Sequence, residues 1–205
     1  MKLIELLNKI STIKVTGSMS DMDIAGIEYD SRKVENNSLF VAVKGFKVDG
    51  HNFIQNALNS GASAIILDDE EFVPEELFKA HDAIKIFVKD SRIAMAEASN
   101  FFYGEPSKKM NVIGITGTNG KTTTSYFIKN ILEQAGIKTG LIGTINNYIG
   151  DEKLISKLTT PESNELNKLL NEMHLAGCKY VVMEVSSHSL ALSRVYNIDF
   201  NSALF

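Results

Sequence analysis

The sequence predicts an α/β protein of two domains: a small mixed α/β domain, then a parallel-sheet domain that opens with a phosphate loop (P-loop). Residues 1–103 mix short β-leaning runs with two helical segments. From Asn111 onward, apolar strand-like runs alternate strictly with helices, which is the pattern of a parallel sheet with crossover helices. The polar breaker Gly104–Lys109 separates the two patterns, so we place the domains at 1–105 and 110–205.

The first domain is expected to contain four strands and two helices. The helix over Asn52–Asn59 stops before Gly61, a residue suited to a helix C-terminus. A longer helix over Ser91–Tyr103 has Ser91 as its capping residue and apolar residues at helical spacing. The predicted strands are Ile24–Tyr29, Ser38–Val43, Ala64–Leu67 and Ile84–Val88.

The second domain reads as alternating strands and helices. Helices are expected over Lys121–Ala135, closed by Gly136, and over Pro161–Ala176, with Pro161 in the first turn. The predicted strands are Asn111–Thr116, Lys138–Ile145, Lys179–Val185 and Phe200–Phe205. Because the last residues form an uncapped apolar strand, we expect a truncated domain, with further segments beyond Phe205 and no turnover by this chain alone.

Composition narrows the class of partner and compartment. The chain has 205 residues, of which 44% are hydrophobic and 22% charged, as in a globular protein with a full core. Its net charge of −4 and lack of a basic run argue against a nucleic-acid partner, although a local anion pocket stays possible. The lone Cys178 cannot form an internal disulfide, and no segment resembles a signal peptide or a membrane span. We expect a cytoplasmic protein with no membrane partner.

The strongest motif is the run GITGTNGKTTT, which follows an apolar strand and opens a helix. Glycines let backbone N–H groups turn toward phosphate oxygens, and the helix N-terminus favours an anion. Lys121 is placed to reach the β- and γ-phosphates, and the Thr122 hydroxyl to bind magnesium. The first glycine of the usual pattern is replaced by Ile115, and a glycine-rich turn without a ligand is the alternative. The expected ATP-binding residues are Gly117, Thr118, Asn119, Gly120, Lys121, Thr122 and Thr123.

Several other residues have both a functional and an ordinary structural interpretation. Glu184 ends a predicted strand at the sheet edge where ligands of open α/β sheets bind, so it could hold magnesium, or it could cap the next helix. Ser186 could also cap that helix, and Thr160 the helix after Pro161. Arg194 suits a carboxylate or a phosphate but could be an ordinary surface residue. Three histidines without metal-ligand spacing are expected at the surface or in caps: His51, His81 and His174.

The motif GTNGKTTT resembles the ATP loop of the Mur ligase family. Three further segments agree with that family in order and spacing: Asp30–Val34 leading into LFVAVKG and Asp49-Gly50, the Thr159-Thr160-Pro161 run, and MEVSSHSL over Met183–Leu190. The first of these is similar to the uridine-binding domain of the tripeptide- and pentapeptide-forming synthetases. MEVSSHSL followed by Arg194 resembles the tripeptide synthetases.

This resemblance implies a UDP-muramoyl-substrate domain followed by an ATPase domain that uses ATP and Mg²⁺. The implied reaction phosphorylates a carboxylate of UDP-N-acetylmuramoyl-L-alanyl-D-glutamate to an acyl phosphate, which the amine of meso-diaminopimelate or lysine attacks, in peptidoglycan precursor synthesis. Lys121 and Glu184 are the implied catalytic residues, with Thr122 and Glu184 on the metal. The implied substrate-binding residues are Ser31, Thr159, Thr160, Ser186 and Arg194, with Phe46-Lys47-Val48 in a neighbouring uracil loop.

Other interpretations stay open. The pentapeptide-forming synthetase shares the first domain, whereas folylpolyglutamate-type ligases lack it. A non-catalytic module that binds a nucleotide or a UDP-sugar is a different class of function. The family's second metal site, its carbamylated lysine and its amino-acid domain would lie beyond Phe205. Leu158 stands where many relatives have Asn, which removes one polar contact.

Overall fold

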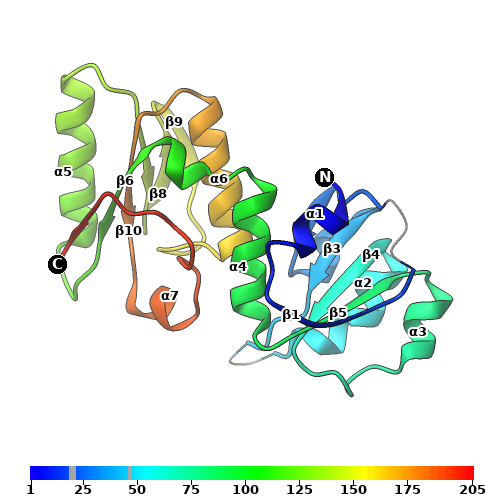
Figure 1. Cartoon of the computed structure of the whole chain (residues 1–205). Coiled ribbons are helices and arrows are strands. Elements are labelled where there is room, and N and C mark those ends of the chain that lie inside the picture. The colour runs from blue at the N-terminus through cyan, green and yellow to red at the C-terminus, as the bar shows by residue number, and fades with distance from the viewer. Residues whose placement is uncertain (19–21, 46–47) are drawn as a thin grey trace. The chain divides into compact units, whose positions relative to one another are not determined.

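A computed structural model describes residues 1–18, 22–45 and 48–205, which divide into two compact units, Met1–Phe102 and Tyr103–Phe205 (Figure 1). Each unit has its own mixed sheet, with helices packed against it, and the α/β fold class is confirmed. Over the described residues, no helix combines the length and the apolar character that crossing a bilayer requires. The two units are described in turn.

The first unit has a five-stranded sheet in the order β1-β5-β4-β3-β2. Strands β2, β3, β4 and β5 are parallel to one another, whereas β1 pairs antiparallel with β5. The bounds are β1 Thr12–Thr16, β2 Gly26–Glu28, β3 Ser38–Val41, β4 Ala62–Leu67 and β5 Ile84–Val88. The sequence did not predict β1, because none of its residues is fully buried and it lacks an apolar run.

Helices cover both faces of this sheet. Along β3, Leu39 and Val41 pack with α1 and α4, while Phe40 packs with α2 and α3 on the opposite face. This alternation follows from the two-residue period of a strand, and it leaves β3 buried on both sides. The helices are α1 Leu3–Leu7, α2 Ile54–Asn59, α3 Glu75–Ala80 and α4 Ser91–Phe102, with 3₁₀ turns η1 Ser31–Lys33 and η2 Gly50–Phe53.

The second unit has a six-stranded sheet in the order β11-β6-β10-β7-β8-β9. Strands β11, β6, β10 and β7 are parallel, whereas β7, β8 and β9 form an antiparallel meander. The bounds are β6 Asn111–Ile115, β7 Thr139–Ile142, β8 Asn146–Ile149, β9 Glu152–Ile155, β10 Tyr180–Glu184 and β11 Ser202–Leu204. The predicted parallel strands are present, but the strand expected over Lys138–Ile145 ends at Ile142, and the sequence did not predict the antiparallel strands β8 and β9. Strand β9 is largely exposed, so it carries no buried apolar signal in the sequence.

Helices α5 (Lys121–Gln134) and α6 (Ser163–Leu175) cover opposite faces of this sheet (Figure 1). Along β10, Val181 and Met183 pack with α6, and Val182 packs on the α5 side. Two short elements complete the unit: the 3₁₀ turn η3 over Pro106–Lys109, within the predicted breaker, and helix α7 over Ser187–Ala191.

The start of α6 differs from the prediction. Its capping residue is Glu162, so Pro161 precedes the cap and does not lie in the first turn. Thr160 is not the cap either, because its hydroxyl donates to the backbone oxygen of Glu184 at 2.8 Å. The Thr160 hydroxyl, which the sequence predicted to cap α6, therefore forms a long-range hydrogen bond to β10 instead.

Candidate functional site

The predicted phosphate loop joins β6 to α5. Gly117 and Gly120 have φ of +128° and +82°, a left-handed backbone that glycine adopts without strain. Gly120 is the capping residue of the 14-residue helix α5 and has no neighbouring atom within 4 Å of where a Cβ would be. The loop is therefore open above the helix N-terminus.

Unpaired donors gather at this loop. Within the part of the chain that the structure describes, the backbone N–H groups of Thr118, Asn119 and Gly120 have no acceptor. Lys121 Nζ lies over the loop and donates to the backbone oxygen of Gly117 at 2.5 Å. Together with the N-terminal end of the α5 dipole, these groups are the kind of donor set that suits an anion such as a phosphate group.

Glu184, the last residue of β10, lies beside this loop and is completely buried, at 0% exposure. Its Oε2 accepts hydrogen bonds from Thr122 Oγ1 and Thr144 Oγ1, both at 3.0 Å, and its Oε1 accepts from the Thr144 backbone N–H at 3.0 Å. Among the described residues, no cationic side chain forms an ion pair with this carboxylate. A buried carboxylate held only by neutral donors favours a bound cation.

The donor set fits magnesium. The Thr122 hydroxyl and the Glu184 carboxylate are hard oxygen ligands at the mouth of the loop. Over residues 1–18, 22–45 and 48–205, His, Cys, Asp and Glu side chains form no group of three that could hold a metal. Magnesium commonly binds through one or two protein oxygens together with substrate phosphates, so this sparse set agrees with that ion.

The loop residues and Glu184 line one cleft of about 340 Å³. Its lining residues are Thr118, Asn119, Gly120, Lys121, Thr122, Thr123, Thr144, Thr159, Glu184 and Ser186. The sequence did not predict Thr144, because the expected strand ran through it to Ile145. In the structure β7 ends at Ile142, so Thr144 follows the carboxyl end of the strand next to β10. A polar residue after a buried strand is the signal that could have identified it.

Thr160 and Arg194 lie behind the cleft and do not line it. The Thr160 hydroxyl, which donates to the Glu184 backbone oxygen, also accepts from the Ser186 N–H at 3.2 Å. Arg194 donates to the Thr160 backbone oxygen at 3.1 Å and pairs with Glu162 at 2.7 Å. The Arg194 side chain is only 14% exposed, so the alternative of a surface arginine is wrong. Both residues brace the segment that carries Thr159.

Ser186 caps α7, as expected, because its Oγ accepts the Ser189 N–H at 3.1 Å. The alternative in which Glu184 caps this helix is wrong. Since Ser186 also lines the cleft, one face of this cap lies next to Glu184.

Ser31 belongs to the first unit, where it begins the turn η1. The turn is capped by Asp30, which accepts the Arg32 N–H and pairs with the Arg32 guanidinium. The side-chain hydrogen bond from Arg32 lowers the pKa of Asp30 to about 2. Within the described residues the hydroxyl of the half-buried Ser31 has no hydrogen-bonding partner. In the expected uracil loop, Phe46 and Lys47 lie outside the described residues, and Val48 is exposed.

His51 is neither a surface residue nor a helix cap, which corrects the prediction, since it is 2% exposed. Its Nδ1 lies 2.6 Å from Asp49 Oδ1 and its Nε2 lies 3.3 Å from Asp68 Oδ1. Burial works to lower the pKa of His51, but the hydrogen bonds that its ring donates to the Asp68 and Asp49 carboxylates outweigh burial and raise the pKa. Burial works to raise the pKa of Asp68, yet hydrogen bonds from His51 and Ser91 bring it down to about 2. We call these three side chains the His51 clamp.

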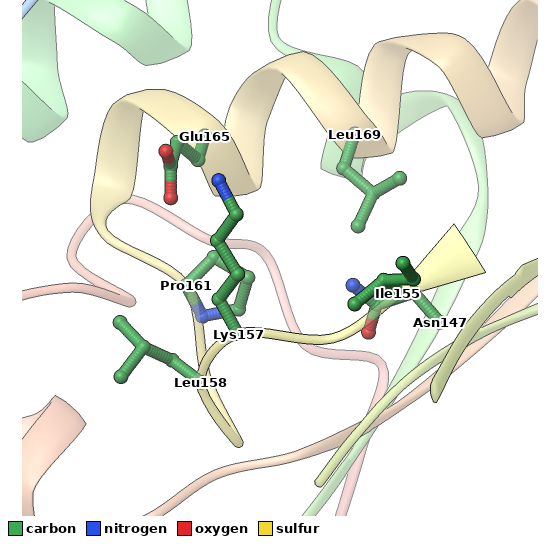
Figure 2. A pocket seen from close by; sticks show the side chains of 7 residues that line it. All are labelled: Asn147, Ile155, Lys157, Leu158, Pro161, Glu165 and Leu169. Carbon is green, nitrogen blue, oxygen red and sulfur yellow. The ribbon is translucent and has the colours of Figure 1, made fainter. Parts of the chain in front are cut away.

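A second pocket, of about 170 Å³, lies between the β8–β9 hairpin and the start of α6 (Figure 2). Lys157 and Glu165 point toward one another across it. Its lining residues are Asn147, Ile155, Lys157, Leu158, Pro161, Glu165 and Leu169. The segment before α6 therefore lines both pockets, with Leu158 and Pro161 in this one and Thr159 in the cleft.

Comparisons with known proteins agree with this geometry. The "Mur ligase family, catalytic domain" profile matches residues 23–103, and the "Mur ligase middle domain" profile matches residues 115–205. The chain is 49% identical over 205 residues to the UDP-N-acetylmuramoyl-L-alanyl-D-glutamate–2,6-diaminopimelate ligase of Clostridium tetani, covering 100% of this chain and 41% of that protein. It is 52% identical over 182 residues to the Clostridium perfringens ligase of the same name, covering 89% and 36%.

Solved structures give the same result. A structure of a UDP-N-acetylmuramoyl-L-alanyl-D-glutamate–2,6-diaminopimelate ligase superposes with a TM-score of 0.80 at 25% identity, covering 100% of this chain and 40% of that one. The UDP-N-acetylmuramoylalanyl-D-glutamyl-2,6-diaminopimelate–D-alanyl-D-alanyl ligase of Acinetobacter baumannii shares the fold, with a TM-score of 0.53 at 24% identity over 83% of this chain and 32% of that one. This chain spans about two fifths of the length of the curated relatives it matches. Two Mur ligase profiles match in order and the relatives match over the whole chain, so the chain belongs to the Mur ligase family.

Proposed function

We propose that this chain is the substrate- and ATP-binding part of a ligase that joins meso-diaminopimelate to UDP-N-acetylmuramoyl-L-alanyl-D-glutamate. The observation that carries the proposal is the buried Glu184 carboxylate bonded to Thr122 at the mouth of the phosphate loop. The names of the relatives favour diaminopimelate over lysine and the tripeptide product over the pentapeptide product. The reaction would serve peptidoglycan precursor synthesis in the cytoplasm.

Each unit has its own task in this proposal. Residues 1–105 bind the UDP-muramoyl peptide, with Ser31 at the nucleotide, and residues 110–205 bind ATP. The unpartnered Ser31 hydroxyl supports the first assignment, and the loop donors over Gly117–Thr123 support the second. Thr159, Thr160, Ser186 and Arg194 form the substrate side of the ATP unit, Thr159 and Ser186 directly in the cleft and the other two behind it.

The chemistry follows from what these residues can hold. A free carboxylate does not react with an amine at useful rates, because oxide is a very poor leaving group. Transfer of the γ-phosphoryl group of ATP to that carboxylate gives an acyl phosphate, from which phosphate leaves when the amine attacks. Lys121 and the loop N–H groups orient the phosphates and neutralise their charge, which is the main protein contribution to phosphoryl transfer. Magnesium held by Thr122 and Glu184 would supply further neutralisation of the phosphate oxygens.

The first test is nucleotide binding by the chain itself. Lys121→Ala should weaken binding of Mg-ADP by about 1–3 kcal/mol, because a charged donor to phosphate is lost. Titration calorimetry of parent and variant measures this difference, with Lys109→Ala as a control on a lysine outside the cleft. Equal affinity in the parent and the Lys121 variant would refute the assignment of the loop.

The second test separates the ligase from a non-catalytic binding module. A longer form of the protein, as long as the relatives, should make the tripeptide from ATP, diaminopimelate and the UDP-muramoyl dipeptide, as measured by mass spectrometry. Ser31→Ala should raise the KM for the UDP substrate more than it lowers kcat. Nucleotide binding without product in the longer form would favour the binding module.

A further inference from the structure

Thr144 makes two hydrogen bonds to one carboxylate. Its backbone N–H donates to Glu184 Oε1 and its hydroxyl donates to Glu184 Oε2, each at 3.0 Å. One residue therefore holds both oxygens, which fixes the rotation of the carboxylate plane. A carboxylate offers about four acceptor positions, and Thr122 takes one more, so about one position is left.

The backbone around Thr144 is itself held in place. The preceding Gly143 donates its N–H to Asn147 Oδ1 at 3.1 Å, and its carbonyl accepts from Ser156 Oγ at 2.6 Å. Gly143 also packs directly against the Glu184 side chain, where a Cβ would collide with Oε1. The Thr144 donors are thus preorganised by contacts from β8 and from the segment after β9.

The hydroxyl of Thr144 also connects two parts of the cleft. Its Oγ1 lies 3.0 Å from Thr159 Oγ1. A hydroxyl has a single hydrogen and a carboxylate can only accept, so Thr144 donates to Glu184 and must accept from Thr159. The direction of the chain is Thr159 to Thr144 to Glu184.

From this geometry we infer that Thr144 is a positioning residue, which orients Glu184 for the metal and links it to Thr159 on the substrate side. The inference rests on the proposed function, because it takes Glu184 as the magnesium carboxylate. Thr144 touches neither metal nor phosphate in this role. Thr144 acts by keeping the Glu184 oxygens directed toward the loop. Thr159 supports Thr144 by donating a hydrogen bond to its hydroxyl oxygen.

The test compares ADP binding in magnesium and in EDTA, by calorimetry on the 205-residue chain. Thr144→Val keeps the size and the backbone N–H but removes the hydroxyl, so Mg-ADP binding should weaken about tenfold. Binding of ADP in EDTA should not change, and Thr144→Ser should restore most of the affinity for Mg-ADP. Thr12→Val, at an exposed residue of β1, is the matched control and should match the parent.

A double variant tests the link to Thr159. If Thr159 acts through Thr144, then Thr159→Val weakens Mg-ADP binding less than Thr144→Val, and combining them adds nothing to Thr144→Val alone. Independent, additive losses would overturn the link. If circular dichroism shows that Thr144→Val is unfolded, the variants Thr144→Ser and Thr159→Val take its place. A Thr159→Val variant that binds Mg-ADP as tightly as the parent would overturn the link between Thr159 and Thr144.

The outcomes separate this inference from the proposed function. A parent chain that binds no nucleotide would overturn both. A parent that binds Mg-ADP, together with a Thr144→Val variant that binds it equally well, would overturn the positioning role alone. An equal loss in magnesium and in EDTA would also overturn it, because it would show a general structural effect.

Discussion

Replacing Gly143 with alanine should displace the Glu184 carboxylate. The added Cβ would collide with Glu184 Oε1 and lie 3.2 Å from Glu184 Cδ, whereas the backbone of Gly143 has no left-handed strain to add. The carboxylate must move and lose at least the Thr144 N–H bond. A hydrogen bond to a charged group contributes about 1.5–3 kcal/mol. A Gly→Ala change returns about 0.4–1 kcal/mol through the unfolded chain, so we expect a net loss of about 0.5–2.6 kcal/mol.

The measurement can be confined to the second unit. The chain contains no tryptophan, but Cys178 is its only cysteine and is buried in that unit. Pulsed labelling of this thiol along a urea series therefore reports unfolding of the unit that contains Gly143. The matched control is Gly26→Ala in β2, where a Cβ meets no atom within 4 Å and a small gain is expected. Because Gly26 lies in the first unit, which does not contain Cys178, the unfolding of the control variant is followed by far-UV circular dichroism.

A double-mutant cycle tests the cause. In a Glu184→Ala background the atoms that the new Cβ would meet are absent, so Gly143→Ala should become nearly neutral. If Gly143→Ala destabilised the unit equally with Glu184 and with Ala at that position, the reasoning from the collision would be refuted.

Two further predictions concern titratable groups. The fold raises the pKa of His51 above 6.5, so the clamp's contribution is complete below pH 6.5 and is lost as the pH rises through the folded pKa. The fold lowers the pKa of Asp68 from 3.8 to about 2, so its contribution is present above pH 3.8 and is lost as the pH falls through about 2. The urea midpoint of the parent, measured as a function of pH, should therefore fall at both the acid and the alkaline end. In His51→Gln the fall at the alkaline end should be smaller, and an equal fall in both proteins would contradict the role of the His51 clamp. Burial also raises the pKa of the Cys178 thiol, so a thiol reagent at pH 8 should label the native chain far more slowly than the chain in urea, and equal rates would count against the buried site.

The strand–loop–helix context of the predicted phosphate loop came from contiguous signals, and the structure has it between β6 and α5. Gly117, Gly120, Lys121 and Thr122 lie within six residues, and their spacing predicts an anion site, which stays a prediction. Strand β5 was predicted with its observed bounds, because it is a short run that is apolar except for Lys85, and all but one of its residues are fully buried.

Contacts between distant segments could not be predicted in the same way. Thr144 and Glu184 are 40 residues apart, and only the pairing of β7 with β10 brings them together. His51 was taken for a surface or cap residue because nothing near it in sequence shows that Asp68, 17 residues later, forms the other side of its pocket. The position of Thr160 before a helix predicted a capping role, but its hydroxyl forms a hydrogen bond to β10 instead.

The two edges of the second sheet differ in what they can accept. The outer strand β9 carries Glu152 and Lys153, and charged side chains on a short edge strand discourage another strand from pairing there. The opposite edge, β11, has no charged residue over Ser202–Leu204 and is exposed along its length. Any strand that extends this sheet, from the same polypeptide or from another molecule, would therefore be directed to β11, on the side of β6 and away from the hairpin.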